Sequence, residues 1–204
     1  VYKRQVLDKS RIQLYTNFDE PLEEQELKQY RGYVARRAAR EPVAYILGHK
    51  GFLQYDFKVT KDTLIPRPET ELLVEQLVSL NRDRGPVRIL DLGCGSGILS
   101  IAALKLGAKH AFACDIDDKC QDVAYENAAL NGIGRDAYTV RVGDILTDQA
   151  LQAEIGGGYD IVLANIVADV IIAMAPLFAR YLKKTGTLIV SGIIAERAEE
   201  VTGH

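Results

Sequence analysis

The chain has 204 residues, 48% apolar and 26% charged, which is enough for one α/β core and a small accessory unit. A formal net charge of -3 gives no overall field toward nucleic acid or an anionic membrane, and we expect no direct nucleic-acid site. Three cysteines without a CxxC pair indicate small buried thiols and argue against a disulfide framework or metal site. No apolar run approaches the ~20 residues that span a bilayer and no secretion signal is visible, so we expect a cytoplasmic protein without a membrane partner.

The first part of the chain predicts a small helical domain and a hairpin. Residues 21–40 carry apolar side chains at helical spacing, with acids in the first turns and bases in the last, as the helix dipole favours. Pro42 ends this helix. Residues 44–60 are rich in aromatic and β-branched side chains and interrupted by glycines, which predicts a hairpin. A second helix is expected over 69–80. The basic side chains of the first helix form either a docking face for an acidic partner or a solvated surface: Lys28, Arg31, Arg36, Arg37 and Arg40.

After a polar linker at 81–86 the pattern changes to alternating strands and amphipathic helices, which predicts a doubly wound, mainly parallel α/β sheet of the Rossmann-like kind. The expected strands are 87–92, 110–115, 138–143, 159–164 and 187–192, and the expected helices are 96–106, 117–131 and 168–183. We therefore divide the chain into a helical recognition domain (1–42), a hairpin and linker helix (43–85) and a sheet domain (86–204). Ligands of such sheets bind at the carboxyl ends of the strands.

A glycine-rich turn follows the first strand of the sheet: Asp91-Leu92-Gly93-Cys94-Gly95-Ser96-Gly97. A dinucleotide fingerprint would have glycine where Ile98 stands, and Asp91 would repel a pyrophosphate. The turn resembles the first motif of class I methyltransferases, whose cofactor, S-adenosylmethionine (SAM), is cationic and carries no phosphate. The resemblance implies that SAM contacts Asp91, Gly93, Gly95 and Gly97; an ordinary strand-to-helix turn is the alternative.

Two further strand ends carry acids. Asp115 ends the second strand about 20 residues after the glycines, where a carboxylate can accept both ribose hydroxyls; helix capping is the alternative, although Asp117 is available for that task. By resemblance, Ile116 joins the cofactor set, and Asp144 and Ile145 after the third strand hold the adenine. A plain turn competes with this interpretation of Asp144.

The fourth strand ends at Asn165, followed by Ile166, Val167 and Ala168. An amide at this place can orient an acceptor nitrogen without adding charge, and we predict Asn165 as the catalytic residue. It could equally cap the next helix.

Two families are represented in one chain. The stretches EPVAYILG (41–48) and TLIPRPETE (63–71) resemble release-factor glutamine methyltransferases. This implies that the helical domain docks a release factor and that Pro66, Glu69 and Thr70 lie beside the cofactor. The stretches GILSIAA (97–103) and ANIVADVI (164–171), with similar ones around 115–117, 126–132 and 191–193, resemble ribosomal protein L11 methyltransferases.

Each family's other half is missing. The Asn-Pro-Pro-aromatic loop of glutamine methylation is replaced by Asn165-Ile166-Val167-Ala168, and the L11-binding domain is replaced by the release-factor-like part. We interpret the chain as a join of two genes near 90–97, where the families are most alike, with foreign sequence at 1–5. It starts without Met and stops in a helical pattern, so we expect a fragment whose sheet is incomplete beyond residue 204.

The acceptor loop decides between the two activities. A glutamine amide needs a loop that fixes it, whereas a lysine amine is nucleophilic once neutral, and an apolar mouth lowers its pKa. We therefore predict a SAM-dependent protein N-methyltransferase of the translation machinery, of L11 type with a lysine or α-amine acceptor. The alternatives are a release-factor N5-glutamine methyltransferase and an inactive SAM-binding module, with a nicotinamide-dependent dehydrogenase as a distant third.

Overall fold

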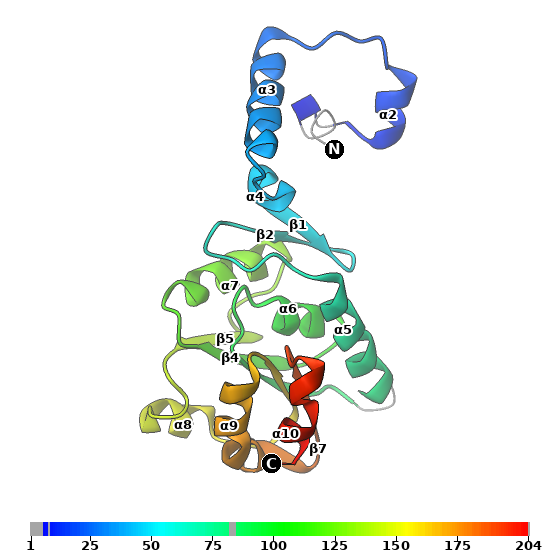
Figure 1. Cartoon of the computed structure of the whole chain (residues 1–204). Helices are drawn as coiled ribbons and strands as arrows, with labels where there is room; N and C mark the ends of the chain where they lie inside the picture. Colours follow the sequence, from blue (N-terminus) through cyan, green and yellow to red (C-terminus); the bar gives the residue numbers. More distant parts are fainter. Residues whose placement is uncertain (1–5, 8, 82–84, 204) are drawn as a thin grey trace.

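The computed structural model describes residues 6, 7, 9–81 and 85–203. The expected foreign stretch at 1–5 and residues 82–84 of the polar linker lie outside the described residues. The sheet domain carries the hairpin on one side, and a helical arm extends from the hairpin away from the sheet (Figure 1).

The arm contains α2 (Arg11–Thr16) and α3 (Glu24–Ala38). Helix α3 begins with a capping box, in which the Glu23 N–H donates to Glu26 Oε2 at 2.7 Å, and it agrees with the helix expected over 21–40. No residue of α3 is buried. Arg36 donates to both carboxylate oxygens of Glu41, at 2.7 and 2.6 Å, and to the carbonyl oxygen of Tyr45 at 3.0 Å. This arginine therefore joins α3 to the following segment, and its guanidinium is already occupied by protein partners.

The expectation of a hairpin from residue 44 was wrong in its first part. Residues Val43–Leu47 form a short helix, α4, between Pro42 at its N-cap and Gly48 at its C-cap. Gly48 has a φ of 78°, a left-handed conformation that ends helices and favours glycine. The hairpin follows as β1 (His49–Phe52) and β2 (Tyr55–Lys58), and the next helix, α5 (Pro68–Asn81), agrees with the predicted 69–80.

The sheet confirms the doubly wound prediction. Its strands are β3 (Arg88–Leu92), β4 (His110–Asp115), β5 (Tyr138–Val142), β6 (Tyr159–Asn165) and β7 (Leu182–Ser191). All neighbouring pairs are parallel, in the order β5-β4-β3-β6-β7. The connecting helices are α6 (Ile98–Lys105), α7 (Lys119–Leu130), α8 (Gln149–Ile155) and α9 (Ala168–Tyr181).

Two details of the sheet domain differ from the expectation. Helix α8 was not predicted; it has only seven residues and starts where the Asp148 side chain accepts a hydrogen bond from Leu151 N at 2.9 Å. Strand β7 begins at Leu182, five residues before the predicted start, because α9 leads directly into it. The pairing of β7 with β6 is irregular between Tyr159 and Ile161.

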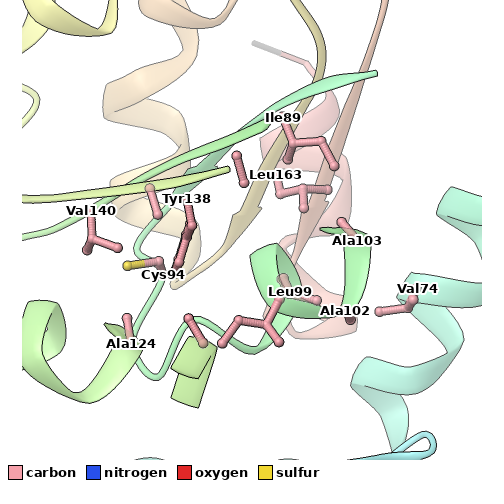
Figure 2. Packing of buried hydrophobic residues seen from close by; sticks show 14 of the residues in the cluster. Val74, Ile89, Cys94, Leu99, Ala102, Ala103, Ala124, Tyr138, Val140 and Leu163 are labelled. Atoms are coloured by element: carbon pink, nitrogen blue, oxygen red, sulfur yellow. The ribbon is translucent and has the colours of Figure 1, made fainter. Parts of the chain in front are cut away.

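Alternation along β3 assigns its side chains to two cores. Leu90 and Leu92 pack on the face covered by α8 and α9, while Ile89 packs on the face covered by α5, α6 and α7. Figure 2 shows Ile89 and Leu163 of the sheet on the side of Ala103 of α6, and Ala102 beside Val74 of α5, in the core on this face. The same alternation directs Asp91 into the α6 face, and this decides its role in the site.

Strand β7 lies at one edge of the sheet and pairs, among the described residues, only with β6. Leu188 on this edge is 39% exposed. A groove of about 310 Å³ lies beside it, lined entirely by apolar residues of α9, β7 and α10 (Ala198–Thr202), a short helix preceded by the 3-10 turn Ala195–Arg197. Within the described ranges, no helix has both the length and the apolar character to cross a membrane.

Candidate functional site

The strand order places a crevice between β3 and β6. From β3 the chain moves outward to β4 and β5, then returns through α8 to β6 on the other side of β3. Such a reversal opens a crevice at the carboxyl ends of the two central strands. Here Gly93 lies directly against Ile166: a Cβ added at Gly93 would be 2.3 Å from Ile166 Cγ2, and Gly93 has a φ of 72°. The close approach therefore requires glycine.

Two cavities meet at this contact, and both are lined by Gly93, Ile166 and Val167. The first cavity, of about 450 Å³, extends over the ends of β4 and β5 and is otherwise lined by Cys114, Asp115, Ile116, Gly143, Asp144, Ile145, Leu146, Val170 and Met174. The second cavity, of about 440 Å³, lies between the glycine turn, the end of β6 and the segment that leads into α5. Its lining includes Asn165, Pro66, Glu69 and Thr70, so together with Gly93 the structure brings five of the predicted residues together there.

Asp115 holds the glycine turn from the end of β4. Its Oδ2 accepts a hydrogen bond from Gly95 N at 2.8 Å, and its Oδ1 accepts one from Asp117 N at 3.1 Å. Helix α7 begins only at Lys119, whose N–H donates to Asp117 Oδ1 at 3.0 Å. The capping alternative for Asp115 is therefore wrong, and its carboxylate faces the first cavity beside Ile116, which is 72% exposed.

Asp144 both builds a turn and lines a cavity, although a plain turn and a ligand-binding position are alternatives from the sequence alone. Its Oδ1 accepts from Leu146 N and its Oδ2 from Thr147 Oγ1, both at 2.9 Å, so the carboxylate builds the turn after β5. The same residue lines the first cavity together with Ile145, whose side chain is buried. A turn and a ligand-facing position are thus compatible here.

The structure places Asp91 beneath the turn and in the lining of neither cavity. It is 1% exposed, and its Oδ2 accepts from Ser100 Oγ at 2.6 Å and from Ser100 N at 3.2 Å. Burial raises the pKa of this carboxyl to about 6, against the opposing effect of the Ser100 hydrogen bonds. Direct contact with a cofactor was expected for Asp91; the geometry instead gives it the task of tying β3 to the first turn of α6.

The other two glycines of the turn differ in their surroundings. Gly95 contacts the small space beside Asp62 and Lys119, outside the two main cavities. Gly97 packs on α7, since a Cβ there would be 2.6 Å from Tyr138 Oη and 3.1 Å from Ala124 Cβ. Both have positive φ values, so they shape the turn.

Asn165 is not the cap of the helix that follows it. Helix α9 begins at Ala168 and its N-cap is Val167, without a side-chain cap. The capping alternative for Asn165 is thus wrong, and its amide lies in the second cavity. Sequence reasoning missed Ser191 and Gly192, which line the same cavity. Gly192 has a φ of 84° and approaches the Ile166 carbonyl oxygen so closely that a Cβ would be 2.8 Å from it; the Ser-Gly pair at the end of a strand was the available signal.

The three thiols are free, as expected, and Cys94 and Cys114 are buried. Burial raises the pKa of Cys114 to about 12, which keeps it uncharged beside Asp115. The described part of the chain contains no group of three His, Cys, Asp or Glu side chains that could hold a metal ion.

Fold and site together define a class of protein. A parallel sheet in this order, a glycine turn at the crevice and an acid at the end of the neighbouring strand are the features of class I methyltransferases. Comparison with known proteins makes the assignment specific. The family model "Ribosomal protein L11 methyltransferase (PrmA)" matches residues 67–204, and the "PrmC N-terminal domain" model matches residues 3–48. The chain belongs to the ribosomal protein L11 methyltransferase family.

Individual relatives agree with this division. A ribosomal protein L11 methyltransferase of Agathobacter rectalis is 44% identical over 134 residues, which are 65% of this chain and 42% of the relative. A release factor glutamine methyltransferase of Geobacter sulfurreducens is 50% identical over 95 residues, 47% of this chain and 33% of the relative. The crystal structure of a ribosomal protein L11 methylase from Lactobacillus delbrueckii subsp. bulgaricus matches with a TM-score of 0.59 at 32% identity, covering 71% of this chain and 70% of that one. The chain spans about two fifths of the length of the curated L11 methyltransferases it matches.

Proposed function

We propose that the chain is a SAM-dependent methyltransferase acting on a protein amine of the translation machinery, of the ribosomal protein L11 type. The observation that carries this proposal is the meeting of two cavities at Gly93 and Ile166, with Asn165 in the second. We further propose a cytoplasmic location and the division into an arm (1–42), a hairpin with its linker helix (43–85) and a sheet domain (86–204).

The residues of the first cavity fit the nucleoside part of SAM. Two carboxylates, Asp115 and Asp144, and no lysine or arginine stand among its lining residues. In dinucleotide-binding folds the pyrophosphate sits on a helix N-terminus behind a GxGxxG turn, and here Ile98 replaces the last of these glycines, which speaks against the dehydrogenase alternative. Asp115 would accept the ribose hydroxyls, and Ile145 and Met174 offer apolar contact to the adenine ring.

The residues of the second cavity fit an amine acceptor. SAM supplies a methyl group on a cationic sulfur, and methyl transfer needs an acceptor nitrogen whose lone pair points along the sulfur–methyl bond. Leu64, Ile166 and Val167 contribute apolar side chains to this cavity, and Arg67 lines it as well as Glu69. Loss of hydration and the arginine charge would lower the pKa of an entering lysine amine, against the opposing effect of Glu69. The side-chain oxygen of Asn165 can then accept a hydrogen bond from an N–H of the neutral amine and orient it. The methylated amine is formed as a cation and loses its extra proton to solvent.

One observation favours the release-factor alternative. The arm matches the N-terminal domain of the PrmC family, and the Geobacter relative named as a release factor glutamine methyltransferase covers nearly half of this chain. A chain with this arm could dock a release factor and still carry an acceptor loop of the L11 type. The identity of the docked protein and that of the methylated side chain are therefore separate questions.

Intact-mass spectrometry of an L11 protein and a release factor, each incubated with the chain and SAM, addresses both. We expect +14 Da steps on L11 and a rate that rises with pH, because only the unprotonated amine has a free lone pair. Asn165→Ala should reduce turnover with little change in SAM affinity. Methylation of the release factor alone with a pH-independent rate would favour glutamine chemistry, and SAM binding without methylation of either protein would favour an inactive binding module.

A further inference from the structure

A buried amide connects the hairpin to the glycine turn. Asn127, on α7, is 0% exposed, and both of its polar atoms are used. Its Oδ1 accepts a hydrogen bond from Lys58 N at 2.7 Å, and its Nδ2 donates to the Ser96 carbonyl oxygen at 3.1 Å. The three residues come from β2, the glycine turn and α7, which are far apart in the sequence.

The two partners of Asn127 lead to opposite walls of the second cavity. Ser96 lines this cavity directly on the side of the glycine turn. Lys58 is the last residue of β2, and the chain continues from it through the buried Val59 and Thr63 to the opposite wall, formed by residues 64–67 with Glu69 and Thr70. A single side chain thus fixes the turn relative to the start of the segment that faces it.

We propose that Asn127 is a positioning residue, which sets the distance between the two walls of the second cavity and thereby the affinity for SAM. Asn127 does not itself line the cavity. It acts through its hydrogen bonds to backbone atoms of Ser96 and Lys58. The proposal rests on the proposed binding of SAM, whose methionine end would extend from the first cavity past Gly93 along the glycine turn, so that the second cavity would hold this end of SAM as well as the acceptor. An asparagine suits this task because one side chain supplies an acceptor and a donor at fixed geometry without charge.

Neighbouring contacts supply a matched control. Asn131, the C-cap of α7, donates from Nδ2 to the Asp56 carbonyl oxygen at 2.8 Å and to the backbone carbonyl oxygen of Asn127 at 2.9 Å. It therefore also holds the hairpin, but none of its described hydrogen bonds reaches the glycine turn, and its replacement leaves the Asn127 side chain in place. Lys58 Nζ pairs with Glu126 at 2.7 Å on the exposed surface. If Asn127 only anchored the hairpin, loss of Asn131 should affect SAM binding in the same way.

The first test compares Asn127→Ala with Asn131→Ala by calorimetric titration with SAM, with thermal unfolding measured in parallel. We expect Asn127→Ala to lower SAM affinity by about tenfold, since it removes the part-buried hydrogen-bond partners of the Lys58 N–H and the Ser96 carbonyl oxygen on the two walls. Asn131→Ala should lower the melting temperature and leave the affinity within about twofold of wild type. Equal affinity losses in the two variants, or none in Asn127→Ala, would overturn the proposal.

The second test uses a proton to restore the missing donor, and it remains informative if the alanine variant does not fold. In Asn127→Asp a charged carboxylate would face the Ser96 carbonyl, whereas a protonated carboxyl can accept from Lys58 N and donate to Ser96 O as the amide does. Burial raises the pKa of such a carboxyl. The charged and titratable groups around it are the Lys58–Glu126 pair, Asp56 on β2, His49 on β1, which pairs with Asp56 at 3.1 Å, and Lys105 on α6, which donates to the Asn131 carbonyl oxygen; wild type and variant share all of them.

The expected result is a ratio of wild-type to Asn127→Asp affinity that falls from about tenfold at pH 8 toward one at pH 5.5. Normalising to wild type removes the titration of Asp91, which both proteins share. A ratio independent of pH would overturn the proposal. Wild-type protein that fails to bind SAM would instead overturn the proposed cofactor itself, so the two failures can be told apart.

Discussion

Replacing Asp91 by asparagine should change how stability depends on pH. The carboxyl is fully buried, and burial raises its pKa from an ordinary 3.8 to about 6. Below pH 3.8 it is protonated in the folded and the unfolded chain alike. Between pH 3.8 and 6 the unfolded chain releases the proton while the folded chain keeps it, so the stability of wild type falls as pH rises through this window. Above pH 6 the full cost is present.

The size of the effect follows from the pKa difference. One pKa unit corresponds to 1.36 kcal/mol, so the gap between 3.8 and about 6 predicts a loss of about 3 kcal/mol of wild-type stability by pH 7. Asp91→Asn cannot ionise, and its Oδ1 can still accept from Ser100. The amide nitrogen of the asparagine would stand where wild type has Asp91 Oδ1, an oxygen without a hydrogen-bond partner. The free-energy cost of leaving this N–H without an acceptor does not vary with pH.

Urea unfolding of both proteins at several pH values from 4 to 7.5 measures this. The free energy of unfolding of Asp91→Asn relative to wild type should rise by about 2.5 kcal/mol across the series, because more than half of the unfolded-state carboxyl is already ionised at pH 4. Ser100→Ala is the matched control: it removes the hydroxyl bond, which lowers the Asp91 pKa, and keeps the bond from the Ser100 backbone N–H. The Asp91 pKa should therefore rise, and the decline in stability should extend to higher pH. If the free energy of unfolding changes with pH in the same way for wild type and Asp91→Asn, the raised pKa of Asp91 is refuted.

Three further results are expected. Gly93→Ala should destabilise the protein by about 1–3 kcal/mol, because Gly93 has a positive φ and lies against Ile166, and it should abolish SAM binding measured by calorimetry. Adding Ile166→Ala should restore part of the stability. If it restores none, the proposed clash with Ile166 is wrong. Asp115→Ala should weaken SAM binding by roughly 1.5–3 kcal/mol, as it removes the ribose acceptor and the bond to Gly95; unchanged affinity would refute the assignment. The edge at β7 should cause concentration-dependent association in sedimentation runs, reduced by Leu188→Lys, whereas a monomer at high concentration would count against an open edge.

The sequence predicted the sheet and much of the site because parallel strands bring their carboxyl ends to one edge. Chain order alone therefore placed Asp115 and Asn165 near the glycine turn. Asp91 was misplaced because every residue from Ile89 to Leu92 is buried, and only alternation counted from the two cores shows which face it points to. Helix α4 was missed because three of its five residues, Val43, Tyr45 and Ile46, favour strands, and its limits are set by Pro42 and Gly48. The Asn127–Lys58 bond joins residues 69 positions apart and leaves no local pattern.

The absence of buried residues along α3 has a thermodynamic consequence. An element that covers no apolar surface of its neighbour shares little stabilisation energy with it, so α3 should open in hydrogen exchange without opening the sheet. It also means that one arm can be exchanged for another during evolution at little cost to the sheet domain, provided that the exchange leaves the hairpin and its bonds to α7 intact. The separate matches at residues 3–48 and 67–204 are what such tolerance permits.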